Sequence, residues 1–205
     1  MAALPWFFGH AGRFVGYRKA IVRMKPFPFP DKENSMEELK QDYVFPKIEP
    51  ERVDEIFEDA WAVGEEQARR FLEKHDIGIS DRRLDMRKVF RESGIRLQEE
   101  DIDYVLGKRR YFAEYLSGKN LMKIYTKSVA LWCETNGFGY EEGLNVILCH
   151  EYFHYLEWNV IGMTSRRYQV PILKIGSLKI GRTGVPSLSE IGANAFANVC
   201  YRYLA

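Results

Sequence analysis

The feature that most constrains this chain is a His-Glu-x-x-His pattern within a largely apolar stretch. His150 and His154 are four residues apart, so on a helix they lie on one face about one turn apart. Two imidazoles placed in this way can bind one zinc ion, and Glu151 can then reach a water molecule at that ion. Zinc lowers the pKa of such a water from about 16 to about 7. Glu151 is therefore the expected general base.

The sequence around the motif indicates a buried helix. Residues 144–158 are mostly apolar, and the apolar positions surround the helix instead of forming one stripe, which is typical of a core element. Burying two histidines and a glutamate there costs free energy unless something compensates them. A metal ion would do so. The alternative is a helix whose two histidines are satisfied by ordinary hydrogen bonds.

A catalytic zinc site also needs a third protein ligand and one open position. No histidine follows His154, so we expect a carboxylate, and Glu190 is the best candidate. It opens the last periodic segment, residues 190–201, where small residues on the same face allow close approach to another helix. Asn194, one turn further, is the expected hydrogen-bond partner of a ligand. Glu157 is a poor candidate because it points away from His154 on the same helix.

Glu190 has an alternative role. Ser187-Leu188-Ser189-Glu190 also fits a capping box, in which the Glu190 carboxylate would reach back to the backbone of Ser187. Glu190 would then stabilise the start of its own helix and bind no metal.

The two motifs together resemble the ImmA/IrrE-type metallopeptidases, which have a gluzincin-like site with a glutamate as third ligand. The second motif of that family runs Glu, two residues, Ala-Asn, one residue, Phe-Ala. It is matched here at Glu190, Ala193, Asn194, Phe196 and Ala197. The resemblance covers roughly residues 50–205. It implies a small helical domain with a short antiparallel sheet, zinc held between two helices, and regulatory cleavage of a specific protein.

From these patterns we expect an α+β fold: a mainly helical, zincin-like domain with a short antiparallel sheet over residues 50–205. Residues 1–49 form a separate basic, proline-rich arm, with room for a helix only around residues 36–41. A long amphipathic helix follows Pro50, and Asp81 can cap a shorter one. Residues 111–116 and 121–126 read as a hairpin, whose second strand is a candidate edge for peptide docking.

The segment 165–187 between the motifs is basic and contains no acid. One interpretation is a lid in which Arg166, Tyr168 or Arg182 stabilises an oxyanion. The other is a solvated loop containing a hairpin at residues 172–175 and 178–180.

Composition excludes some other classes of protein. The net charge of +1 gives no reason to expect nucleic-acid binding. No apolar run reaches 18 residues, so no membrane span is expected. The three cysteines show no paired spacing, which is typical of reduced thiols in a cytoplasmic protein.

The sequence therefore predicts a zinc-dependent peptidase acting on a protein or peptide, with zinc on His150, His154 and Glu190 and with Glu151 as general base. Two alternatives stay open. One is a zinc-bearing binding module without turnover, and the other is a structural protein that binds no metal.

Overall fold

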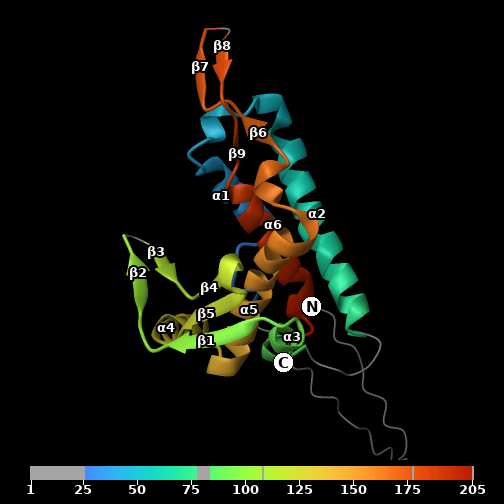
Figure 1. Cartoon of the computed structure of the whole chain (residues 1–205), viewed down its shortest axis with the longest axis vertical. Coiled ribbons are helices and arrows are strands. Elements are labelled where there is room, and N and C mark those ends of the chain that lie inside the picture. The colour runs from blue at the N-terminus through green and yellow to red at the C-terminus, as the bar shows by residue number, and fades with distance from the viewer. Residues whose placement is uncertain (1–25, 78–83, 108, 177, 205) are drawn as a thin grey trace, which may run out of the picture.

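The computed structural model describes residues 26–77, 84–107, 109–176 and 178–204. The described part of the chain is a mainly helical α+β structure with six α-helices and small sheets, as expected (Figure 1). The α-helices are α1 (Lys32–Lys40), α2 (Val53–Lys74), α3 (Met86–Glu92), α4 (Thr126–Asn136), α5 (Tyr140–Leu156) and α6 (Ser187–Tyr201). Short 3₁₀ turns lie at Phe45–Lys47, Pro50–Arg52, Ser117–Lys119 and Thr164–Arg166, and a π-helical turn lies at Glu157–Ile161.

The strands form one three-stranded sheet and three two-stranded pairs. The main sheet has the order β1-β5-β4 and contains β1 (Arg96–Glu100), β4 (Ala113–Leu116) and β5 (Leu121–Tyr125). The pairs are β2 (Tyr104–Leu106) with β3 (Arg109–Tyr111), β6 (Gln169–Val170) with β9 (Thr183–Gly184), and β7 (Leu173–Ile175) with β8 (Leu178–Ile180).

The predicted hairpin is present as β4 and β5, which pair antiparallel from Ala113 opposite Ile124 to Leu116 opposite Leu121. The expectation that its second strand offers a docking edge is wrong. β5 is the central strand, because β1 pairs with its other side in parallel. The edge strands of this sheet are therefore β1 and β4, and β4 is the one that belongs to the predicted hairpin.

Helix α6 packs against α2 on one side and α5 on the other. Glycines allow this close approach: a Cβ on Gly64 of α2 would lie 2.1 Å from the carbonyl oxygen of Gly192 on α6. A Cβ on Gly192 would in turn lie 2.6 Å from the ring of Phe153 on α5. α2 and α6 thus meet backbone to backbone, and α6 meets α5 through the Phe153 ring that lies on Gly192.

Two clusters of buried apolar residues flank α6. The larger contains the inward faces of α3, α4, α5 and β5, and it includes Ala193 and Ala197 from α6. The smaller lies between α1, α2 and the other face of α6, and it includes Leu39 and Val44 from the segment before α2. Residues 32–48 therefore share a core with the helices that follow.

Two helix starts differ from expectation. The cap of α3 is Asp85, whose side chain accepts a hydrogen bond from the Lys88 backbone. Asp81, the predicted cap, lies outside the described residues. Helix α1 begins at Lys32, four residues before the predicted start, and Asp31 caps it. In both helices the observed cap is an aspartate whose side chain accepts a backbone N–H three residues further along, as is typical of this position.

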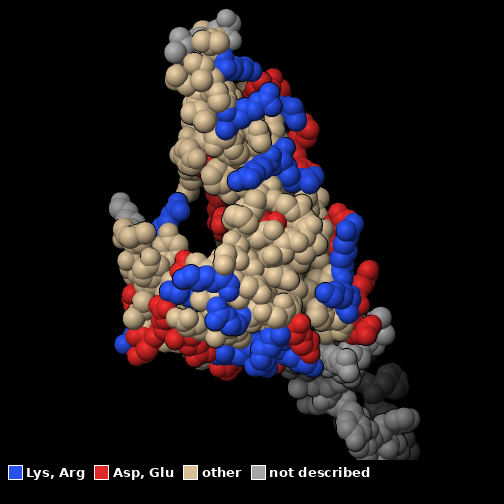
Figure 2. All heavy atoms as spheres, in the orientation of Figure 1, with Lys and Arg blue, Asp and Glu red and all other residues tan. Residues whose placement is uncertain are grey.

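The two hairpins β2–β3 and β7–β8 project from the body of the molecule (Figure 1). Figure 2 shows a hollow in the surface between the β2–β3 hairpin and the helical body, with acidic atoms visible inside it. Among the helices of the described residues, none is both long and apolar enough to cross a membrane.

We predict that Gly64→Ala lowers the free energy of unfolding by about 1–3 kcal/mol, because the added methyl group would separate α2 from α6. The clash outweighs the gain of about 1 kcal/mol in helix propensity from replacing glycine. Urea denaturation measures the change. Gly118→Ala is the control, since its Cβ would meet nothing within 4 Å. Equal stabilities of the two variants would contradict the close-packing argument.

Candidate metal centre

Helix α5 carries both histidines and is buried along most of its length. It begins after Gly139, whose N–H donates to the Glu142 carboxylate at 3.2 Å. Its middle is also tied to α3, because the side chain of Asn145 bonds the backbone at Leu84 and Met86. These contacts fix the position of α5 on the N-terminal side of His150 and His154.

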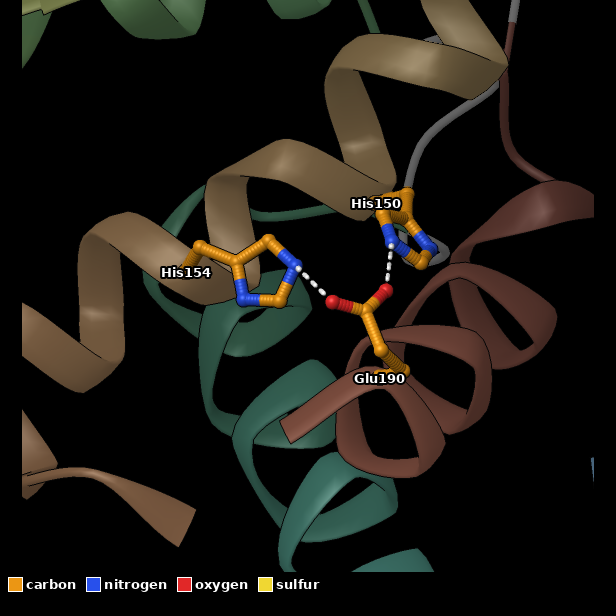
Figure 3. A group of neighbouring side chains, drawn as sticks. All are labelled: His150, His154 and Glu190. Atoms are coloured by element: carbon orange, nitrogen blue, oxygen red, sulfur yellow. Dashed lines mark ion pairs between the residues drawn. The ribbon is translucent and has the colours of Figure 1, made fainter. Parts of the chain in front are cut away.

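Helix α6 brings Glu190 to the histidines. The helix begins at Ser187, so Glu190 lies in its first turn and its carboxylate projects between the two imidazoles (Figure 3). One carboxylate oxygen is 3.4 Å from Nε2 of His150, and the other is 3.7 Å from Nε2 of His154. Together, His150, His154 and Glu190 form a group that could hold a metal ion, with one ligand atom from each within 4.8 Å of the others.

The donor set suits zinc in chemistry and in spacing. Bonds of 2.0–2.2 Å from a tetrahedral zinc ion place neighbouring ligand atoms about 3.4 Å apart. The distance between His150 and Glu190 equals this value, and the distance between His154 and Glu190 is slightly longer. The distances from Glu190 are therefore close to those of a tetrahedral site, and all three ligand atoms lie within 4.8 Å of one another. Imidazole and carboxylate also accept manganese or iron.

The alternative capping box is not formed. Ser187 is already inside α6, and its cap residue, Pro186, makes no side-chain cap. The backbone N–H of Ser187 is satisfied by Asp42, which accepts it at 2.8 Å. The Glu190 carboxylate is thus available to the imidazoles.

Glu157 lies just beyond α5 and does not join the three ligand atoms. Its side chain is fully buried, and one of its oxygens is 3.0 Å from Nδ1 of His154, on the side of the ring away from Glu190. The other oxygen accepts hydrogen bonds from the Thr164 backbone and the Ser189 hydroxyl. Its exclusion as a ligand was expected, but its contact with His154 was not.

Asn194 was expected to hold a ligand, and the structure places it against α1 instead. Its amide donates to Glu38 at 3.0 Å and to Ser35 at 3.3 Å. Burial and, to a smaller extent, the charge of Glu190 raise the pKa of Glu38. Asn194 therefore orients a carboxylate that lies close enough to the centre to interact with Glu190.

Phe29 covers one side of the centre. Its ring stacks on the imidazole of His150 with 4.9 Å between ring centroids and 21° between ring planes. Nδ1 of His150 is buried and has no hydrogen-bond partner among the described residues. The two histidines are therefore held differently, one by ring stacking and the other by a carboxylate.

The pKa values of Glu190 and His154 are shifted in opposite directions. Burial, the largest contribution, raises the pKa of Glu190, but the hydrogen bond from His150 and the charge of His154 outweigh it and lower the value to about 2. Burial lowers the pKa of His154, whereas the Glu157 hydrogen bond and the charges of Glu190 and Glu151 raise it to about 9. Without a metal, the centre is a charged His–Glu pair.

Carboxylates outnumber imidazoles around this centre. Burial raises the pKa of Glu151 and of Glu38, and the nearby charge of Glu190 raises both further. Like charges in one site disfavour ionisation. A bound divalent cation would reverse this balance and let the acids ionise.

Two of the three candidates for oxyanion stabilisation, Tyr168 and Arg182, pack elsewhere in the described structure. Tyr168 packs under the Arg52 guanidinium, 5.3 Å from its ring centroid. Arg182 lines a different cavity with Gln169 and Lys179, and Arg166 ends the 3₁₀ turn before β6. The segment forms the predicted hairpin, β7–β8. One cation that the sequence did not suggest, Arg109 on β3, does act at the centre and helps lower the pKa of Glu190.

Sequence reasoning considered Glu157 only as a ligand and did not identify Glu38 or Phe29. The expectation that Glu157 points away from His154 is wrong, because its carboxylate contacts Nδ1 of that ring. The spacing of Glu157 from His154 places it near the same helix face, and this signal could have identified it as a partner of the histidine. Glu38 and Phe29 left no local signal, because more than a hundred residues separate them from the motif.

The chain was compared with protein-family models, curated proteins and solved structures, and none of them matches it. The resemblance to ImmA/IrrE-type metallopeptidases therefore rests on the motif residues and on the His150, His154 and Glu190 group.

We predict that the chelator-treated protein loses stability between pH 6.5 and about 9. The pKa of His154 is raised from 6.5 to about 9 on folding, so its contribution is complete below pH 6.5 and disappears as the folded protein loses that proton. Thermal unfolding at the two pH values measures the loss, expected to be several degrees. His154→Gln should show a smaller decline, and an equal decline would contradict the assignment.

Proposed function

We propose that this protein is a zinc-dependent peptidase. The observation that supports this most strongly is the convergence of His150, His154 and Glu190, from two helices, with their ligand atoms within 4.8 Å. The excess of carboxylates over imidazoles supports a divalent cation at the same place. The side chain of Glu190 is 56 % exposed, whereas those of His150 and His154 are only 10 % and 20 % exposed, so water reaches the group from the side of Glu190.

The chemistry follows from the residues that surround the ligands. When bound, zinc would act as a Lewis acid that polarises the scissile carbonyl and acidifies water. Glu151, next to His150 on α5, accepts the proton from the attacking water and delivers it to the leaving amine. Burial, the largest cause, raises the pKa of Glu151, and a divalent cation beside it would lower that pKa toward the base form that this role requires.

The substrate is proposed to be an extended segment of protein or peptide. β4 is an edge strand of the main sheet and packs against α5. Its Glu114 is close enough to Glu151 for its charge to raise the pKa of that base. An extended peptide that adds to the free edge of β4 would therefore pass beside the general base. The motif resemblance adds the proposal of a regulatory, cytoplasmic peptidase with one specific protein substrate.

One observation favours the zinc-bearing binding module as a second candidate. Two of the three candidate oxyanion donors pack elsewhere in the described structure, Tyr168 against Arg52 and Arg182 in a different cavity. A module of this kind would bind zinc and a partner without cleaving it. Glu151 separates the two functions, because only the peptidase needs it.

We predict about one zinc per chain in the wild-type protein and a large loss of zinc in Glu190→Ala, because two imidazoles alone leave the site a ligand short. Mass spectrometry of metal content measures both after zinc is supplied and excess is removed. Glu66→Ala is the matched control, since Glu66 is exposed on α2 and pairs with Arg70. A wild type without zinc would refute the metal centre.

We predict that Glu151→Gln keeps its zinc and loses about 10²–10⁴-fold in peptide cleavage, because the amide cannot accept the proton from water. Cleavage of a peptide library, followed by mass spectrometry, measures the rate. A wild type that binds zinc but cleaves nothing would favour the binding module. Full activity in Glu151→Gln would rule out Glu151 as the base.

A further inference from the structure

We propose that Glu157 is a positioning residue that sets the tautomer of His154 and holds both ligand-bearing helices in register. This inference rests on the proposed metal centre. It concerns a residue that touches neither the ion nor the substrate and acts through His154.

The contacts of Glu157 divide between its two oxygens. Oε1 accepts a hydrogen bond from the Thr164 backbone N–H at 2.8 Å and another from the Ser189 hydroxyl at 2.7 Å. Oε2 lies 3.0 Å from Nδ1 of His154. The residue is 1 % exposed. A carboxylate this buried is retained only when such partners compensate it.

This arrangement determines which ring nitrogen of His154 is free. A carboxylate oxygen can only accept a hydrogen bond, so Nδ1 must carry the proton that it donates to Oε2. The neutral ring then presents the lone pair of Nε2, the nitrogen that faces Glu190. A metal ligand needs that lone pair. The partner on Nδ1 also makes the ring more basic and fixes its plane.

The same carboxylate connects the two helices. His154 belongs to α5, whereas Ser189 belongs to α6 and directly precedes Glu190. A shift of α6 relative to α5 would break the bond from Ser189 and would also move Glu190 away from the imidazoles. Glu157 therefore links the position of His154 on α5 to the position of Glu190 on α6.

A purely structural role would be different. Glu157 could serve only to anchor the turn at Thr164, and then its contact with His154 would be incidental. The isosteric variant Glu157→Gln distinguishes these roles. Its amide oxygen can still accept from Thr164 and Ser189, but its NH₂ group faces Nδ1 and requires it to act as acceptor. That tautomer places the proton on Nε2, where the metal should bind.

The test is zinc affinity, measured by competition with a chromophoric chelator, for the wild type, Glu157→Gln and Ser189→Ala. Loss of the partner of a metal-binding histidine typically costs 10–100-fold in affinity, and we expect this for Glu157→Gln. Ser189→Ala removes the bond that links Glu157 to α6 but leaves Oε2 on His154, so we expect a loss of affinity that is smaller than that of Glu157→Gln.

A spectroscopic readout in the zinc-loaded protein tests the tautomer directly. In ¹H–¹⁵N spectra of the wild-type imidazoles, we expect the His154 Nδ1–H proton downfield and protected from exchange. The His150 Nδ1–H proton should not show this downfield, protected signal, because Nδ1 of His150 has no hydrogen-bond partner among the described residues. In Glu157→Gln at saturating zinc, the protected His154 signal should be lost.

The outcomes are separable. A wild type that binds no zinc would refute the proposed function. If the wild type binds zinc, but Glu157→Gln has unchanged affinity and His154 shows no protected Nδ1–H, only the role of Glu157 is overturned. If Glu157→Gln fails to fold, the wild-type spectrum and the Ser189→Ala affinity still decide the inference.

Discussion

The close contact of α6 with α2 and α5 is the constraint on which the rest of the structure depends. Gly64 of α2 leaves no space for a side chain against the Gly192 backbone, and Gly192 leaves none against the Phe153 ring of α5. This contact sets how near Glu190 comes to α5. A ligand atom must lie within a few tenths of an ångström of its place around a metal ion. The candidate centre therefore depends on Gly64 and Gly192, although neither residue supplies a ligand atom.

The centre is a balance of charges as much as a set of ligand atoms. The Glu190 carboxylate lies between two imidazoles and is stabilised as an anion, with its pKa lowered to about 2. Glu151 and Glu38 beside it have raised pKa values, since burial and the Glu190 charge disfavour their ionisation. A divalent cation relieves both effects at once. The competition between a proton and a metal for His154 follows from the same electrostatics.

The sequence predicted much of the fold for local reasons. Helix periodicity predicted α2 and α6, the apolar segment around the His-Glu-x-x-His motif predicted α5, and the turn between aromatic-rich runs predicted β4 and β5. It did not predict that β1 would pair in parallel with β5 and make β5 central. It also placed the α3 cap at Asp81, whereas Asp85 caps the helix. Strand neighbours and cap choices depend on long-range packing, which a local pattern does not contain.

The sequence by itself determined the chemical identity of the candidate centre, because helix geometry alone puts His150 and His154 on one face. It could not decide whether Glu190 caps its helix or meets those histidines, since both fit the same residues. Only the tertiary structure decided this, by starting α6 at Ser187 and packing it against α5. It alone also revealed Glu157 behind His154 and Phe29 over His150. Contacts of this kind arise from the close packing of elements distant along the chain.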